Sequence, residues 1–261
     1  MDQCEQRERC EEHYWGCYCR RARDGFFVRL SDPALPEEPL HNCLQLKKQI
    51  APRLLRKTLE ERLQPVRAGR QPFLALRTAF DPAACPEAFP AGAKVVPEGV
   101  FVLEAGRAAV EAWPASAACK LRALTAADLP ALETVQAEAA QQPADPARMR
   151  RLGQRRGQAA LSVPELQMWL AWAGECPAGK CALYCRGGAA KLENLSVVPE
   201  LRRQGIATAL LRRLTLEALD AGCTQVYLTA QLDTGAPALY RSLGFVPAER
   251  SWISLWRPEN L

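Results

Sequence analysis

The chain has 261 residues, a net charge of +5 at pH 7 and a pI near 8.7. No apolar run approaches the roughly 20 residues that a membrane-spanning helix needs, and the N-terminal stretch MDQCEQRERCEEHYW is too charged for a secretory signal peptide. We therefore expect a cytoplasmic protein without a membrane partner. The mild positive charge does not demand a nucleic-acid partner either.

The length and the cysteine content also limit the class of protein. A chain of this length exceeds one ordinary domain, so we expect two parts, residues 1–115 and residues 118–261, joined by a linker around 111–118. The eleven cysteines are an odd number, and so long a chain can bury an adequate core without disulfides. Most of the cysteines are therefore expected to be free thiols in a reducing compartment.

Cysteines and both histidines gather near the N-terminus, at Cys4, Cys10, His13, Cys17, Cys19, His41 and Cys43. Zinc accepts such ligands, so a zinc-dependent interaction module is one hypothesis, which metal analysis of the purified protein would test. The CxC spacing is not the usual CxxC, however, and Cys4 and Cys10 lie in a charged segment that can form a free amphipathic helix. We expect no metal site here.

The N-terminal half has few marked elements. A strand is predicted at Phe26 to Leu30 and a helix from Pro52 to Leu63, followed by strands at Phe73 to Leu76 and Val100 to Leu103. This half has no phosphate-binding turn, and no clear internal repeat relates it to the rest of the chain. It is interpreted as an additional α/β half.

The C-terminal half reads as alternating strands and helices. Residues 120–132 predict a strand, a helix cap at Thr125 and a helix, and a second helix follows at 146–156. A hairpin of 167–172 with 180–185 comes next, and 251–256 alternates as a closing strand. The class is α/β or α+β, with a mixed sheet covered by helices.

The segment LENLSVVPELRRQGIATALLRRL, residues 192–214, joins a strand to a helix. Leu195 and Val197 alternate with polar residues, whereas apolar residues recur at helical spacing from Ile206 onward. The first turn of a helix offers unpaired N–H groups and the positive end of the dipole. Gly205 lets a ligand approach the backbone closely. We expect an anion, and hence a phosphate-bearing ligand, at residues 202–207, here called the phosphate turn.

The pattern VxPxxRxxGIAxxLL resembles the pyrophosphate-binding signature of the GNAT superfamily of N-acetyltransferases, with Arg202, Gly205 and Ala207 at its three defining places. Residues 233–245, DTGAPALYRSLGF, resemble the second family motif, NxxAxxLYxxxGF, at the expected distance. The two motifs cover residues 192–246. The resemblance implies a mixed, mostly antiparallel sheet flanked by helices.

The resemblance further implies that acetyl-CoA is the acetyl donor and that a primary amine of a small molecule or protein attacks its thioester directly. Main-chain groups near Leu195 and Val197 would bind the pantetheine arm, with Asp233 standing where the family usually has asparagine. Arg202 would add positive charge. The pyrophosphate would lie on the amides of Arg203, Gln204, Gly205, Ile206, Ala207 and Thr208.

The same resemblance gives Tyr240 the role of protonating the leaving thiolate, although an aromatic residue at this place can also simply pack the helix against the sheet. Glu193 is the candidate general base, with solvent exposure as the alternative. The family often carries a glutamate at the place of Thr229, which cannot serve as a base. An acyl-CoA-binding sensor without catalysis is therefore the alternative function.

Two questions stay open in the sequence. The N-terminal half is either a degenerate copy of the same fold, as in tandem GNAT proteins, or an unrelated cap over the acceptor pocket. Neither the acceptor nor the oligomeric state is indicated by any residue pattern.

Overall fold

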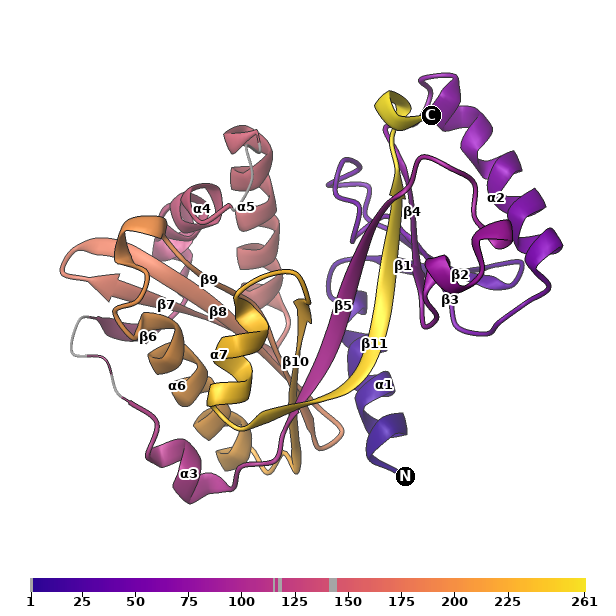
Figure 1. Cartoon of the computed structure of the whole chain (residues 1–261). Helices are drawn as coiled ribbons and strands as arrows, with labels where there is room; N and C mark the ends of the chain where they lie inside the picture. Colours follow the sequence, from indigo (N-terminus) through magenta and orange to yellow (C-terminus); the bar gives the residue numbers. More distant parts are fainter. Residues whose placement is uncertain (1, 115, 117–118, 141–144) are drawn as a thin grey trace. The chain divides into compact units, whose positions relative to one another are not determined.

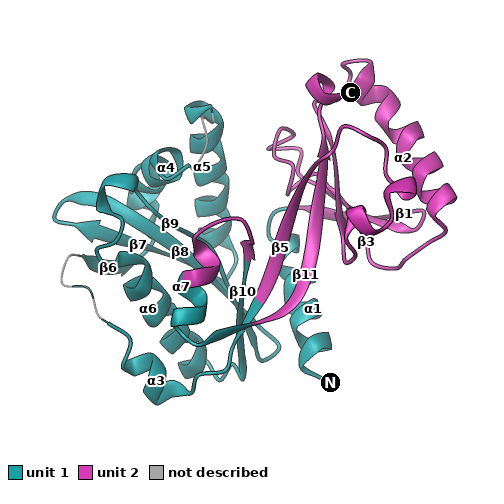
Figure 2. Cartoon of the chain, in the orientation of Figure 1, with its two compact units in different colours: residues 1–18, 101–229, 239–246 teal, residues 19–100, 230–238, 247–261 magenta. Residues whose placement is uncertain are grey.

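The computed structural model describes residues 2–114, 116, 119–140 and 145–261 (Figure 1). The chain divides into two compact units (Figure 2). Unit 1 comprises residues 1–18, 101–229 and 239–246, and unit 2 comprises residues 19–100, 230–238 and 247–261. Several elements begin in one unit and end in the other: β5 (Lys94–Leu103), β10 (Gln225–Gln231), α7 (Ala236–Ser242) and β11 (Phe245–Trp256).

Unit 1 is a mixed, mostly antiparallel sheet flanked by helices, which confirms the expected fold class. Its strands are hydrogen-bonded in the order β10-β9-β8-β7-β6, and the β9/β10 pair is parallel whereas the other pairs are antiparallel. Helix α6 packs on β8 and β9, α4 and α5 pack on β8 and β7, and α1 packs on β9. The elements are α1 (Gln3–Gly16), α3 (Arg107–Glu111), β6 (Lys120–Ala123), α4 (Leu129–Glu138), α5 (Pro146–Ser162), β7 (Leu166–Ala173), β8 (Cys176–Arg186), β9 (Ala189–Val197) and α6 (Ile206–Asp220).

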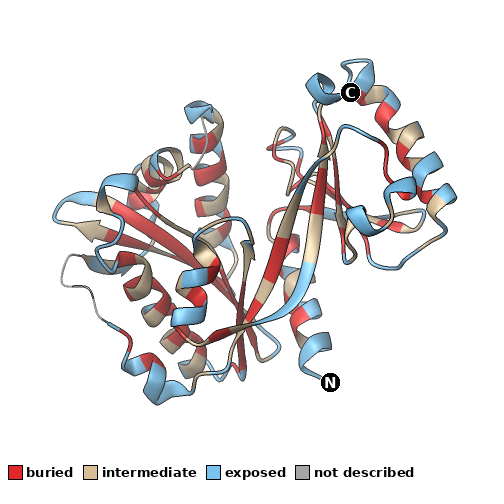
Figure 3. Cartoon of the chain, viewed as in Figure 1, coloured by how far each residue is buried: buried red, intermediate tan, exposed pale blue. Residues whose placement is uncertain are grey.

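Local sequence signals account for these elements. Thr125 forms the predicted cap as a capping box, since its N–H donates to Asp128 Oδ2 at 3.0 Å while its side chain caps the turn. The middle of β8 and the start of β9 are buried on both faces (Figure 3). Such strands are nearly continuous apolar runs, as in ALYC and AAKL, and the buried lysines Lys180 and Lys191 are exceptions that need partners.

Unit 2 holds strands in the order β1-β2-β3-β4-β11-β5 around a core of Phe27, Leu59, Leu63 and Trp256 with their neighbours. The β3/β4 pair is parallel, whereas β1/β2, β2/β3 and β4/β11 are antiparallel. Its other elements are β1 (Arg20–Asp24), β2 (Phe27–Ser31), β3 (Leu44–Leu46), α2 (Pro52–Arg67) and β4 (Leu74–Thr78).

The two units repeat one topology. In unit 2 two antiparallel pairings lead to β3, and helix α2 then crosses to the parallel strand β4. In unit 1 three antiparallel pairings lead to β9, the last two in the same order as in unit 2, and α6 crosses to the parallel strand β10. The residues before the helices also correspond, because KKQ-IAPRLLRK at 47–57 aligns with RRQGIATALLRR at 202–213 once a single residue is left out. Sequence inspection alone missed this repeat.

The unit 2 copy lacks what the phosphate turn needs. No glycine stands between Gln49 and Ile50, and α2 begins at Pro52, which has no N–H to offer. The connection from β3 to α2 is also shorter than the one from β9 to α6. The turn of unit 2 therefore resembles the phosphate turn in sequence but has neither its glycine nor one of its amides.

The compact units differ from the predicted division at residues 115–118. Helix α1 belongs to unit 1, because Cys10, Tyr14 and Trp15 are buried and the helix packs on β9, so it is not the free helix that the charged sequence suggested. The end of β11 belongs to unit 2, where it pairs with β4. Part of the predicted linker lies outside the described residues.

The N-terminal cysteines and histidines make separate contacts. The Cys10 thiol donates to Ala189 O at 3.7 Å, and His41 Nδ1 lies 2.9 Å from Asp32 Oδ2. Over the described ranges, no three His, Cys, Asp or Glu side chains are grouped to hold a metal ion. No disulfide joins any of the eleven cysteines, all of which are among the described residues. None of the helices in the described part combines the length and apolar character of a membrane span.

Candidate active site

The strands β9 and β10 separate where the site begins. They pair in parallel from Ala189 and Gln225 as far as Leu192 and Leu228, while β9 continues to Val197. Just past that point Asn194 adopts a φ of 58°, and the pairing of β8 with β9 shifts register between Lys180 and Ala182. A bulge of this kind turns a strand away from its neighbour. It leaves main-chain groups of β9 without a strand partner on the β10 side.

A small pocket of about 120 Å³ lies at this separation. Both predicted catalytic side chains line it, and so does Thr229. The remaining lining residues come from β9, α6 and β10: Leu192, Asn194, Leu195, Leu211 and Leu228. The fold thus brings together residues that are up to 48 positions apart in the sequence, from Leu192 to Tyr240.

Tyr240 is 6% exposed, with its ring 5.9 Å from that of Phe101 and 6.1 Å from that of Phe245. Burial raises the pKa of the Tyr240 phenol above its ordinary value, and the charges of Cys181 and Glu193 act in the same direction. The phenol therefore remains protonated at neutral pH. The side chain has both properties considered from the sequence, since it packs against aromatic rings and lines the pocket.

The Glu193 carboxylate is held by two elements. Its Oε2 lies 2.8 Å from Lys191 Nζ and accepts a hydrogen bond from Thr229 Oγ1 at 3.3 Å, while Oε1 accepts from the Asn194 N–H at 3.3 Å. Glu193 is thus not the freely solvated residue of the alternative interpretation. Thr229, counted from the sequence only as a missing glutamate, supplies a donor to the glutamate on the neighbouring strand.

Sequence reasoning missed the side chains of α1 that contact Lys191 and Asn194, the neighbours of Glu193 on β9. Lys191 Nζ lies 2.7 and 2.8 Å from the two carboxylate oxygens of Glu11, which is on α1. Asn194 Nδ2 also donates to the hydroxyl of Tyr14 at 3.3 Å. The one available signal was a lysine in the apolar run that begins β9, but its partner stands 180 residues earlier and has no local pattern.

The phosphate turn has the predicted backbone. Gly205 caps α6 with a φ of 79°, Arg203 has a φ of 64°, and Gly205 O accepts the helical hydrogen bond of Ala209 N at 2.9 Å. The amides of Ile206, Ala207 and Thr208 therefore precede the first helical hydrogen bond, as an anion site requires. The side chain of Ile206 itself is buried.

The Arg202 side chain, predicted to add positive charge, also makes contacts that hold the turn. Its Nε donates to Val197 O at 3.1 Å and its Nη2 to Ala139 O at 3.4 Å, so the guanidinium ties the turn to β9 and the end of α4. Ser116 Oγ donates to Gln204 O at 2.8 Å on the same turn. Asp233 belongs to unit 2, where it follows β10 and is exposed.

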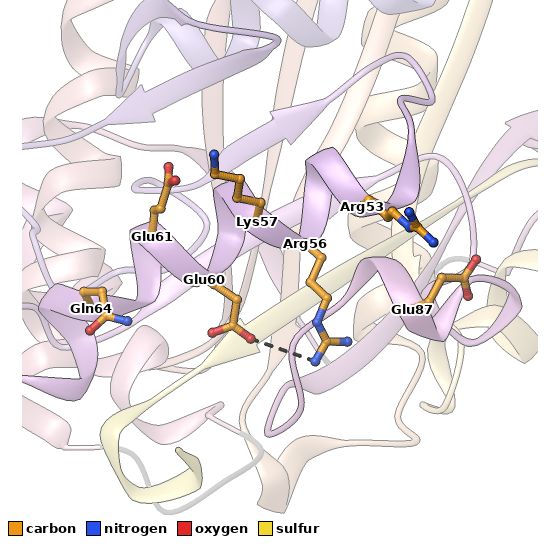
Figure 4. Close-up of a pocket in the computed structure, with 7 residues that line it drawn as sticks. All are labelled: Arg53, Arg56, Lys57, Glu60, Glu61, Gln64 and Glu87. Atoms are coloured by element: carbon orange, nitrogen blue, oxygen red, sulfur yellow. Dashed lines mark ion pairs between the residues drawn. The ribbon is translucent and has the colours of Figure 1, made fainter.

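Unit 2 has a hollow of about 490 Å³ along α2 (Figure 4). Only charged and amide side chains line it, and they come from one helix face and the turn at Glu87: Arg53, Arg56, Lys57, Glu60, Glu61, Gln64 and Glu87. Arg56 and Glu60 form an ion pair of 4.0 Å within it. Alternating charges on an exposed helix are usual for a solvated surface.

Residues 164–247 match the family model of the acetyltransferase (GNAT) domain. The matched segment contains the separated strands, the phosphate turn and Tyr240. The C-terminal part of this chain is a GNAT domain. Human N-acetyltransferase 8 is 42% identical to it over 67 residues, which are 25% of this chain and 30% of that protein. The chain therefore spans less than a third of the length of this curated relative.

Two solved structures have a fold similar to that of most of this chain. A GCN5-related N-acetyltransferase from Kribbella flavida has a TM-score of 0.65 at 18% identity, with 99% of this chain and 96% of that chain covered. A tandem GNAT protein from the clavulanic acid biosynthesis pathway has a TM-score of 0.59 at 16% identity, with 90% and 81% covered. These likenesses show the fold, and the second agrees with a two-half architecture.

Proposed function

We propose that the chain is an N-acetyltransferase that moves the acetyl group of acetyl-CoA to a primary amine. The observation that carries this proposal is the pocket at the separation of β9 and β10, where Glu193 and Tyr240 both line one space. The phosphate turn begins a few residues beyond the same strand. One strand thus leads from a phosphate-binding backbone to a pair of acid–base groups.

Different residues bind different parts of the donor, acetyl-CoA. The amides from Arg203 to Thr208 bind the pyrophosphate, with Gly205 in the left-handed conformation that exposes them. The main chain at Leu195 and Val197 binds the pantetheine arm, since the bulge at Asn194 has freed it from β10. Asp233 can accept, although not donate, a hydrogen bond from that arm.

Glu193 then acts as the base and Tyr240 as the acid in the acetyl transfer. Glu193 accepts a proton from the ammonium of the acceptor, directly or through water, so that the amine nitrogen can bond to the thioester carbon. The carbon–sulfur bond breaks, and Tyr240 donates its phenolic proton to the leaving sulfur. The raised pKa of Tyr240 keeps that proton in place until the thiolate forms. The nitrogen loses a second proton as the amide forms, and this proton restores the Tyr240 phenol, while Glu193 releases its own proton to solvent. Most of the acceleration comes from holding the two substrates in line.

The test combines binding with turnover. Calorimetry with CoA measures the donor site, and a coupled thiol-release assay with acetyl-CoA and a panel of amines measures transfer. We expect Gly205→Glu to abolish both, because it puts a carboxylate and a Cβ in the phosphate turn. Gly106→Glu, which makes the same change at the N-terminus of α3, is the control and should retain both.

A non-catalytic acyl-CoA sensor is the second candidate, and the threonine at position 229 favours it. The sensor predicts CoA binding that Gly205→Glu abolishes, with no thiol release for any amine. Loss of turnover without loss of CoA binding in Gly205→Glu would contradict both candidates.

A further inference from the structure

Three charged side chains form a row from the N-terminal helix to the pocket. The ammonium of Lys191 has three hydrogens to donate. Two of them meet Glu11 Oε1 and Oε2 at 2.8 and 2.7 Å, and the third meets Glu193 Oε2 at 2.8 Å. Lys191 thus connects a carboxylate on α1 to the one that lines the pocket.

The row is enclosed by the protein. Lys191 is 1% exposed, and its Nζ lies 4.4 Å from the centre of the Tyr14 ring and 5.4 Å from that of Trp15. Trp15 Nε1 donates to Glu11 Oε1 at 2.8 Å, and the Tyr227 hydroxyl donates to Glu11 Oε2 at 3.3 Å. So buried a cation persists only when it is paired.

The pairing keeps Lys191 charged. Burial by itself would lower the pKa of Lys191, but the adjoining carboxylates Glu11 and Glu193 outweigh burial and raise it. A charged lysine in this place fixes one oxygen of Glu193, the carboxylate that is proposed as the general base.

We propose that Lys191, itself held by Glu11 of α1, is the positioning residue for the Glu193 carboxylate, so that the N-terminal helix completes the active site. The proposal rests on the proposed transferase function. Two features set the arrangement apart from an ordinary structural ion pair. It ends at a carboxylate in the pocket, and it fixes the same oxygen of that carboxylate that Thr229 contacts, with a fully enclosed cation.

Glu193 also acts on the pKa values of other titratable groups that surround it. From β8 come Lys180 and Cys181, from α1 and the residues after it come Tyr14 and Tyr18, and from α7 comes Tyr240. None of them is changed in the variants below, so a difference between variants reports on Glu11 and Lys191.

The test is the pH dependence of kcat/KM in two variants whose effects have opposite sign. In Lys191→Met the base loses its cation and keeps a negative neighbour, so the acidic limb of the profile should move to higher pH by roughly one unit or more. In Glu11→Gln the lysine is left with Glu193 alone, so the limb should move to lower pH. Both variants should lower kcat about tenfold or more with little change in the KM for acetyl-CoA.

Glu8→Gln is the matched control, since it removes a carboxylate from an exposed place on the same helix and should leave the profile unchanged. Thermal unfolding of each variant shows whether it folds. Should Lys191→Met fail to fold, the milder Glu11→Gln carries the test alone.

Wild-type CoA binding and turnover are measured first. If the wild type turns over and the acidic limb stays in place in Glu11→Gln, the row is structural only and the inference is wrong, while the proposed function stands. If the wild type releases no thiol with any amine, the proposed function fails and the inference fails with it.

Discussion

Tyr240 shows how one side chain can satisfy two interpretations of its sequence context. Its ring packs between Phe101 and Phe245, as buried aromatic residues do, yet the same residue lines the pocket beside Glu193. This packing fixes the orientation of the Tyr240 ring and therefore the direction of its phenolic O–H. Phenylalanine would preserve the packing and remove only the proton donor.

We therefore expect Tyr240→Phe to lower kcat by about a hundredfold, within the usual range for one acid–base group, and to leave the dissociation constant of CoA nearly unchanged. Steady-state kinetics and calorimetry on the same preparation measure the two quantities. Unchanged kcat would mean that Tyr240 only packs.

Lys180 is the second residue whose pKa is strongly shifted by its environment. It is 2% exposed and donates to Asn194 O at 3.0 Å, so it supports the bulge from β8. Burial lowers the pKa of Lys180 to about 7, and the positive charge of Arg156 acts in the same direction. The unfolded chain has a lysine pKa of about 10.4.

Between pH 7 and about 10 the unfolded state thus binds one more proton than the native state, so the native state should gain stability as the pH rises, by up to about 1.4 kcal/mol per pH unit. Below pH 7 both states are protonated and this slope vanishes. We expect the Lys180→Met variant to lack this increase in stability with rising pH. Denaturant unfolding at pH 7 and pH 9.5 tests this, and an equal change with pH in wild type and variant would refute it.

At the scale of elements, much of the C-terminal half follows from local patterns. The strand before the phosphate turn, helix α6, the hairpin of β7 and β8 and the capped entry to α4 all carry their periodicity within a few residues. The structure places each of them within a few residues of its predicted bounds. The left-handed turn at Gly205 is equally local, because few other residues accept its φ.

The elements that sequence reasoning missed depend on distant partners. The short strands β1 and β3 are defined by pairing with β2 and β4, and their own residues give little sign of it. The candidate site was predicted only in part, because some of its residues also depend on distant partners. Glu193, Tyr240 and the turn lie in recognisable motifs, whereas Glu11 and Lys191 meet only in the folded chain and the inward direction of the Arg202 guanidinium depends on Val197 and Ala139.

At the scale of the whole molecule, the repeated topology makes the N-terminal half a degenerate copy in our interpretation. Both units build a parallel crossover after at least two antiparallel pairings, and the residues before α2 and α6 correspond except for the lost glycine and the added proline. An unrelated cap would have no reason to share either feature.

This interpretation predicts that one chain binds one CoA. The amides needed for a pyrophosphate are complete at Gly205, whereas Pro52 removes an amide from the corresponding turn. Calorimetric titration of the full chain should give a stoichiometry of about one, and Gly205→Glu should reduce it to zero. A second binding event that survives this substitution would show that unit 2 still holds the ligand.

The docking of α1 changes which residues belong with the family motifs of this chain. A fragment beginning at residue 118 would contain every motif of the family, yet it would lack the carboxylate that pairs with Lys191 and the ring of Tyr14 that packs 5.8 Å from Tyr184. An enclosed ammonium and an aromatic surface would then face water. Residues 3–16 therefore belong to the same compact unit as the family signature, and a segment that carried only the signature would leave the partner of Lys191 behind.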